Sequence, residues 1–186
     1  RFGRVSPTTA AHVLSEFEGV LSEAELCVLD GGACGVGIES TIVDASRGRP
    51  VLLRPGMLTA AQIEAVCGQP LQQRDEDAPR ASGTLESHYA PQAKVRLMDA
   101  APIQSALDVL GADARHIAGY SRSRVKSASK HLLQRAMPAD AAACAQELFA
   151  VLRGFDDAGV KLIWIETPPH APEWDGVRDR LQRASA

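Results

Sequence analysis

Residues 93–186 alternate strand-like with helix-like segments, and this order constrains the fold more than any other feature of the chain. The strand-like runs are short and rich in Val, Ile and Leu, and each is followed by a run that is helical in composition or spacing. Such alternation favours a small α/β domain with a parallel sheet and right-handed crossovers. The expected strands are 94–98, 115–120 and 160–166, and the expected helices are 101–110, 138–153 and 173–184.

Residues 1–68 contain a second group of short elements. Ser6 followed by Pro7 indicates a helix start, and apolar residues recur at helical spacing behind it. Two β-rich runs joined by SRGR predict a hairpin, and Thr59 is expected to cap a short helix that stops at Gly68. The expected elements are a helix at 7–16, strands at 27–32, 40–46 and 50–54, and a helix at 59–67.

Residues 69–92 hold Pro, Gly, Ser, Gln and charged residues with almost no aliphatic side chains. This composition predicts a long loop or an interdomain linker. The sequence therefore predicts three parts, which are residues 1–68, the linker 69–92 and the α/β domain 93–186.

The composition excludes several classes of protein. With 186 residues, 45% of them hydrophobic, the chain is long enough for one or two domains with hydrophobic cores. The net charge of −3 provides no global attraction to nucleic acid, so any RNA contact has to be local. No apolar run approaches the roughly 20 residues of a membrane helix and no signal peptide is present, which predicts a cytoplasmic protein without membrane contact.

The four cysteines are scattered without a CxxC pair, so we expect reduced, mostly buried thiols and no structural metal site. The chain has no Walker A loop and no GxGxxG, HExxH or GxSxG motif, which excludes the commonest NTPase, dinucleotide, zinc-protease and hydrolase signatures. The glycine-rich run GGACGVG at 31–37 is typical of a turn between strands, although its amides could also bind an anion.

Polar side chains lie at the ends of the two hairpin strands, within VGIESTIVDASRGRPVLLRPG at 36–56. The hydroxyls there either satisfy turn amides or line a polar site, and the arginine is either a phosphate ligand or a surface ion-pair partner. His88 and Tyr89 either attach the linker to a domain surface or close over a ligand. Together these residues form a candidate site for a phosphorylated, hydroxyl-bearing ligand. The set comprises Ser6, Glu39, Ser40, Thr41, Arg54, His88 and Tyr89.

Four separated motifs resemble, in order and spacing, the threonylcarbamoyl-AMP synthases of the YrdC-like family in their longer two-domain form. They are RFGRVSPTTA, DGGACGVGIESTIVD, PVLLRPGMLT and SHYAP, spanning roughly residues 1–91. The resemblance implies the C-terminal part of a YrdC-like twisted-sheet α/β domain, a long linker and a small Rossmann-like parallel α/β domain.

The resemblance also implies an activity. Family members are nucleotidyltransferases that join L-threonine, bicarbonate and ATP, with Mg²⁺, into threonylcarbamoyl-AMP and pyrophosphate. A separate transferase then uses this intermediate for tRNA threonylcarbamoyladenosine modification. By motif, Ser6 and Arg54 match contacts to ATP, and Ser40 matches a contact to threonine. Thr41 is assigned with Ser40 to the threonine-binding set, and Thr41 and Glu39 are expected to support the pocket. The linker contact to ATP is assigned to Tyr89 or His88, with Tyr89 preferred, while no residue is assigned as an acid or base.

Family members carry further substrate-binding motifs upstream of the SPT motif, and this chain starts where those would end. We therefore expect a C-terminal fragment with an incomplete sheet that is inactive in isolation. The alternative from another class is a noncatalytic RNA-binding or regulatory YrdC-like module with weak contact to tRNA or double-stranded RNA. Its best basic run is RSRVKSASKH at 122–131, although such a run is more typical of a solvated loop in the second domain.

Overall fold

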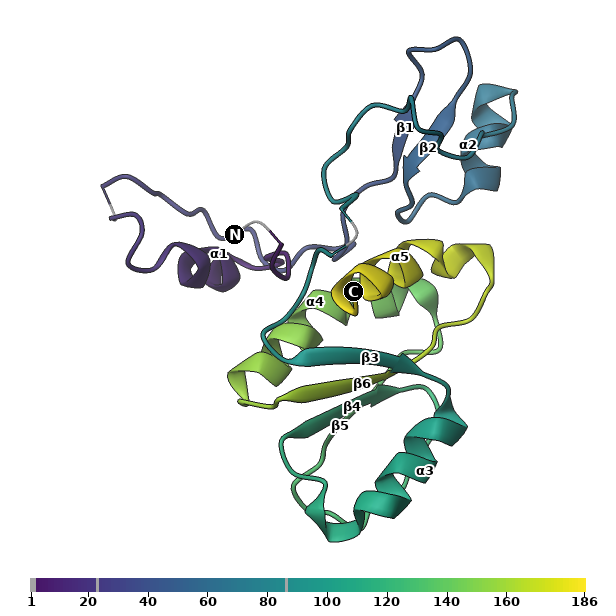
Figure 1. The fold of residues 1–186 in the computed structure, drawn as a ribbon. Coiled ribbons are helices and arrows are strands. Elements are labelled where there is room, and N and C mark those ends of the chain that lie inside the picture. The colour runs from purple at the N-terminus through teal and green to yellow at the C-terminus, as the bar shows by residue number, and fades with distance from the viewer. Residues whose placement is uncertain (1–2, 23, 86) are drawn as a thin grey trace.

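The computed structural model describes residues 3–22, 24–85 and 87–186, and its largest unit is a four-stranded sheet (Figure 1). The strands lie in the order β3-β6-β4-β5, and every neighbouring pair is parallel. The predicted parallel α/β fold is therefore confirmed for this region. The strands are β3 Lys94–Met98, β4 Ile117–Ser121, β5 Leu133–Ala136 and β6 Leu162–Glu166.

Helices cover both faces of this sheet. Helix α3 (Ala100–Leu110) lies on one face, and α4 (Ala141–Asp157) and α5 (Asp175–Ala184) lie on the other (Figure 1). Short 3₁₀ turns, Gly111–Asp113 and Pro172–Trp174, follow α3 and precede α5. Strand β6 is apolar throughout its first four residues because successive side chains point to opposite, covered faces. Thus Ile163 and Ile165 belong to the core beneath α4, and Trp164 belongs to the core beneath α3.

The first third of the chain forms smaller elements. These are α1 (Ala10–Phe17), β1 (Ile42–Asp44), β2 (Val51–Arg54) and α2 (Ala60–Cys67). The predicted hairpin is confirmed, since β1 and β2 pair antiparallel, with a register shift between Ile42 and Val43. Thr59 and Gln62 form a reciprocal capping box at the start of α2, and Gly68 ends that helix in the left-handed conformation, as predicted.

Residues 69–92 do not form a free linker between two separate domains. The backbone of Gln72 exchanges hydrogen bonds with Pro50 and Leu52 beside β2, and the amide of Ala90 donates to the carbonyl of Gly3. Tyr89 lies in the same hydrophobic core as Val5 and the residues beneath α4. The structure therefore does not show the expected arrangement of two domains joined by a long linker. The predicted domain boundaries at residues 68 and 92 stay predictions.

Two glycines let the first third of the chain approach the C-terminal helices closely. A Cβ on Gly37 would lie 2.4 Å from the carbonyl oxygen of Ala145 in α4, and one on Gly176 in α5 would lie 2.7 Å from the carbonyl oxygen of Gly56. Gly37 also has a φ of 81°, which favours glycine. The last glycine of GGACGVG therefore serves close packing against α4.

Several element boundaries differ from the predictions. The strand expected at 27–32 is wrong, because this segment pairs with no strand in the described residues and Leu29 is 89% exposed. Strand β5 was not predicted, since its four residues are all exposed and lack alternation. Helix α1 begins at Ala10, where the Thr9 side chain accepts a hydrogen bond from the His12 amide, and α4 continues to Asp157.

The cysteines are free, but the expectation that they are mostly buried is wrong. Cys27, Cys34 and Cys67 are exposed, and only Cys144 is buried. Burial raises the pKa of the Cys144 thiol to about 11, so that thiol is protonated at neutral pH. In the described part of the chain, no helix combines the length and the apolar character that crossing a membrane requires.

Candidate functional site

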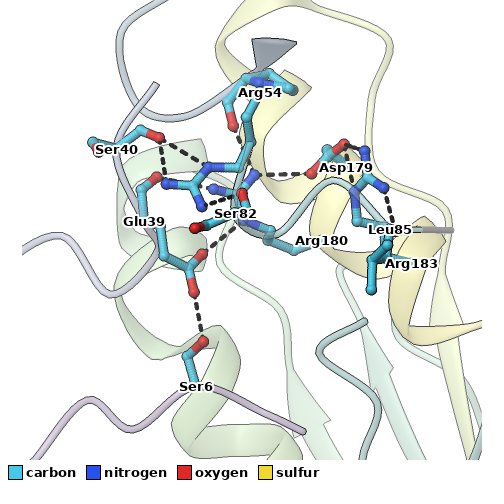
Figure 2. Close-up of polar contacts among 10 residues, drawn as sticks. Ser6, Glu39, Ser40, Arg54, Ser82, Leu85, Asp179, Arg180 and Arg183 are labelled. Carbon is cyan, nitrogen blue, oxygen red and sulfur yellow. Dashed lines mark hydrogen bonds and ion pairs between the residues drawn. The ribbon is translucent and has the colours of Figure 1, made fainter. Parts of the chain in front are cut away.

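The first polar cluster joins the chain before α1 to the segment before β1 and to helix α5 (Figure 2). The Ser6 hydroxyl donates to Glu39 Oε1 at 2.5 Å, and Arg180 Nε donates to Glu39 Oε2 at 2.9 Å. The Glu39 carboxylate thus receives one hydroxyl and one guanidinium from segments far apart in the sequence.

Glu39 is held in its ionised form. Burial alone would raise the pKa of its carboxyl, but the hydrogen bond from Ser6 and the ion pair with Arg180 outweigh burial and lower that pKa below its usual value. Glu39 is therefore a fixed anion at neutral pH and acts as a structural acceptor for the residues around it.

The second cluster is organised by Arg54 at the end of β2. Its Nε and Nη2 atoms donate to the carbonyl oxygen of Ser40 at 3.1 and 2.9 Å, and its Nη1 atom donates to the carbonyl oxygen of Ser82 at 2.9 Å (Figure 2). A guanidinium has five N–H donors, so three such bonds leave two for another acceptor. Arg54 is only 5% exposed and makes no ion pair with the described residues.

Helix α5 contributes Arg180, whose side chain is fully buried. Besides Glu39 Oε2, it donates to the carbonyl oxygens of Glu39 at 2.9 Å and Pro55 at 2.6 Å, and it pairs with Asp179 at 2.9 Å. The two carbonyls belong to the residues next to Ser40 and Arg54. Arg183, on the same helix, pairs with Asp179 and donates to the carbonyl oxygen of Leu85 (Figure 2).

Tyr89 lies between these clusters. Its ring stacks on Phe149 of α4 at 5.4 Å between centroids, and the Arg180 guanidinium carbon lies 5.3 Å from the same ring centroid. The phenol is 1% exposed, and its hydroxyl has no hydrogen-bond partner in the part of the chain that the structure describes. Burial raises its pKa, so the phenol is a neutral donor at physiological pH.

The hydroxyl of Tyr89 approaches the linker at Gly83. A Cβ on Gly83 would lie 1.9 Å from Tyr89 Oη and 2.9 Å from Arg54 Nη1, and Gly83 has a φ of 70°. Only glycine fits between these two side chains at this backbone conformation. Gly83 thereby brings the Tyr89 hydroxyl and the Arg54 guanidinium to the same place.

His88 contacts the edge of the Tyr89 ring, with 4.1 Å between centroids, and its amide donates to the carbonyl of Arg183. Burial lowers its pKa, and the nearby arginines 183, 180 and 54 lower it further against the opposing effect of Glu39. His88 is therefore neutral at pH 7.

The two hydroxyl residues before β1 are placed differently. The Ser40 side chain is exposed, while its carbonyl is held by Arg54. The Thr41 hydroxyl donates to the carbonyl oxygen of Leu58 at 3.0 Å. It therefore satisfies a backbone group of a loop, which is the first of the two roles considered for this hydroxyl. A pocket of about 410 Å³ opens beside these residues, and its lining includes Ser6, Thr8, Gly35, Gly37 and Glu39.

The structure brings together most residues of the predicted set. Ser6 reaches Glu39, Ser40 is held by Arg54, and Tyr89 and His88 pack beside them. Sequence reasoning missed Arg180, Asp179 and the carbonyl of Ser82. A buried arginine in DGVRDRLQR has no local signal that separates it from the exposed arginines of an amphipathic helix, because its partner Glu39 lies 141 residues away. Among the described residues, no group of three or more His, Cys, Asp and Glu side chains could hold a metal ion.

Residues 58–186 match the family described as "Threonylcarbamoyl-AMP synthase, C-terminal domain". The chain is 32% identical to a threonylcarbamoyl-AMP synthase of Bacillus subtilis over 98% of the chain and 54% of that protein. It is 31% identical to one of Pyrococcus abyssi over 98% of the chain and 55% of that protein. The chain thus spans about half the length of these relatives.

Solved structures agree with this assignment. A crystal structure of Pyrococcus abyssi Sua5 complexed with L-threonine matches 99% of the chain and 55% of that chain, with a TM-score of 0.82 and 28% identity. A variant of the same protein, with an adjacent histidine and tyrosine both replaced by alanine, matches with a TM-score of 0.81 and 27% identity, over 98% of this chain and 54% of that one. Because the family match covers more than half of its residues, the chain belongs to the threonylcarbamoyl-AMP synthase family.

Proposed function

We propose that the protein containing this chain is an L-threonylcarbamoyladenylate synthase, and that residues 6–89 contribute part of its substrate site. The observation that carries this proposal is the convergence of Arg54, the Tyr89 hydroxyl and the Ser40 strand end at one place, beside the Ser6 and Glu39 pair. The named relatives support the same activity.

Arg54 and Tyr89 are suited to bind the phosphates of ATP. Arg54 has two N–H donors left after its three carbonyl bonds, and no carboxylate neutralises it among the described residues. The Tyr89 hydroxyl is a neutral donor without a partner in the described residues. We propose that both donate to phosphate oxygens, with Ser6 and His88 completing the ATP-binding set.

Ser40 is suited to bind L-threonine. Its hydroxyl can donate to and accept from the substrate, and the two hydrogen bonds from Arg54 to its carbonyl oxygen fix the backbone that carries it. The solved relative with bound L-threonine supports this substrate. Because its hydroxyl is used by Leu58, Thr41 is proposed to support the position of Ser40 and not to contact threonine itself.

The reaction needs positioning and charge neutralisation more than an acid and a base. The amine of threonine first combines with bicarbonate to form a carbamate, and one water molecule is released. A carbamate oxygen then attacks the α-phosphorus of ATP, and the bond from that phosphorus to the oxygen bridging the α- and β-phosphates breaks. The products are threonylcarbamoyl-AMP and pyrophosphate. Mg²⁺ is proposed to enter with the triphosphate and neutralise its charge, and no described residue is assigned to hold it.

The solved variant with the replaced histidine and tyrosine supports a role for the pair in this chain. His88 and Tyr89 form the single His-Tyr dipeptide of the sequence. We further propose that the product passes to a separate tRNA-modifying transferase in the cytoplasm, and that any contact of this chain with tRNA is weak and local.

The test measures incorporation of labelled bicarbonate into threonylcarbamoyl-AMP, with ATP, L-threonine and Mg²⁺, by the full-length protein that carries this sequence. Arg54→Lys should raise the KM for ATP by about tenfold or more, because an ammonium cannot hold the Ser40 carbonyl and a phosphate together. Arg49→Lys is the matched control, since the one ion pair that Arg49 makes with the described residues is an exposed pair with Asp75. Absence of product from the unaltered protein would overturn the proposal.

A further inference from the structure

We infer that Arg180, in the last helix, is a positioning residue for the site formed by Ser6, Ser40, Arg54 and Tyr89. This inference rests on the proposed function. None of the four site residues lies in the C-terminal part of the chain, yet a single buried side chain from α5 contacts Tyr89 itself and a neighbour or partner of each of the other three.

The hydrogen bonds of Arg180 define this arrangement (Figure 2). Nη2 donates to the carbonyl of Glu39 at 2.9 Å, one residue before Ser40, and Nη1 donates to the carbonyl of Pro55 at 2.6 Å, one residue after Arg54. The guanidinium therefore fixes the separation between the segment before β1 and the end of β2, which carry the proposed threonine and ATP contacts.

The same guanidinium reaches the other two site residues. Nε donates to the Glu39 carboxylate, which accepts the Ser6 hydroxyl, and the guanidinium carbon lies 5.3 Å from the Tyr89 ring centroid. Four of the five N–H donors are used, counting the bond to Asp179. Because these donors already go to oxygens of Glu39, Pro55 and Asp179, the effect of Arg180 acts through the residues it holds.

The hydrogen bonds of Arg180 to Glu39 and Pro55 require a planar guanidinium group. A guanidinium presents its donors in fixed directions and can reach both carbonyls and the carboxylate at once, whereas an ammonium is a point charge on a flexible stem. Replacement by lysine keeps the charge beside Glu39 and Asp179 but loses the link between the Glu39 and Pro55 carbonyls. A displacement of the order of 1 Å at a site can cost up to about a hundredfold in rate.

The experiment compares Arg180→Lys with Arg178→Lys in the full-length protein, using the labelled-bicarbonate assay and thermal unfolding. Arg178 is on the same helix, but its acceptors among the described residues are Pro169, Ala171 and Asp175, all in the C-terminal part. We expect Arg180→Lys to raise the KM for both L-threonine and ATP by about tenfold or more, and Arg178→Lys to leave both within about twofold. A merely structural role would lower kcat through loss of active molecules and leave both KM values unchanged, and that result would overturn the inference.

Two further measurements keep the inference falsifiable. If Arg180→Lys does not fold, Asp179→Asn weakens one bond that orients the guanidinium, and it should raise both KM values in the same direction by a smaller factor. If the unaltered protein gives no product, the proposed function fails while calorimetric affinities for L-threonine and for ATP still test Arg180. Unchanged affinities in the variant, or no binding of either ligand by the unaltered protein, would then overturn the inference as well.

Discussion

Arg54 and Arg180 are both buried cations, yet they use their donors for different acceptors. Among the described residues, Arg54 donates only to neutral carbonyls, whereas Arg180 pairs with the carboxylates of Glu39 and Asp179. Arg54 thus keeps a charge that a phosphate could neutralise, while the charge of Arg180 is already compensated. The sequence indicated Arg54 through its position at a strand end, but it gave no sign of Arg180, whose partners come from distant segments.

The ion pair between Glu39 and Arg180 should make stability depend on pH in the acid range. The folded-state pKa of Glu39 lies below its ordinary value of 4.5, so its contribution is present above about pH 4.5 and is lost as the pH falls through the folded-state pKa. We expect Glu39→Gln to lower the free energy of unfolding by about 1–3 kcal/mol at pH 7. This difference from the unaltered protein should shrink below pH 4.5.

Urea unfolding between pH 7 and pH 3 would measure this difference. Glu76→Gln is the matched control, because Glu76 is exposed and should show no such change. A difference that stayed constant from pH 7 to pH 3 would show that the charge of Glu39 does not contribute.

At the scale of elements, the strand and helix order of residues 94–184 could be predicted because β6 and its helices follow clear apolar patterns. Strand β5 could not, since an exposed edge strand has no apolar periodicity to detect. The expected strand at 27–32 failed for the opposite reason. Its composition is β-like, but no neighbouring strand pairs with it in the described residues. In both cases, the presence or absence of a partner strand determined whether the segment forms a strand, and its local β-propensity did not.

Replacing either of two helical glycines by alanine should change the free energy of unfolding, but in opposite directions. Gly154 in α4 is exposed, and a Cβ there would meet no atom within 4 Å, so Gly154→Ala should raise the free energy of unfolding by about 0.5–1 kcal/mol. Gly176 in α5 faces the Gly56 carbonyl and Ile38, so Gly176→Ala should lower it by about 1–3 kcal/mol. Chemical denaturation of the two variants measures both values, and a change of the same sign in both would contradict the packing described here.

At the scale of the whole molecule, one hydrophobic core includes Val5, Ile38 and Tyr89 together with residues beneath α4 and α5. The composition change at 69–92 indicated a linker, but it could not show that Tyr89 would enter this core. The polar run contains few apolar residues, and it is held by the burial of the Tyr89 ring together with the backbone hydrogen bonds of Gln72, His88 and Ala90. The site is therefore assembled by tertiary contacts among the first third of the chain, residues 82–89 and helix α5.

The charge distribution of the whole chain predicts weak RNA binding. The net charge is −3, and the best basic run, 122–131, has four exposed cations, of which Arg122 already pairs with Glu166. A salt titration of RNA affinity should give a slope of log affinity against log salt concentration no steeper than about −4. Replacing Lys126 and Lys130 by glutamine should flatten it further. A steeper slope would favour the RNA-binding module over the enzyme.

The close contacts at Gly37 and Gly176 also bear on how such proteins can be recombined. At both positions the backbone of one part touches the backbone of another, so the fit depends on residues from two stretches of sequence at once. A chimera that takes its first third from one relative and its last helices from another would bring together surfaces that were never matched. The two stretches should therefore be taken from the same relative. A chimera that folds would need Gly37, Ile38, Gly56 and Gly176 from one parent protein.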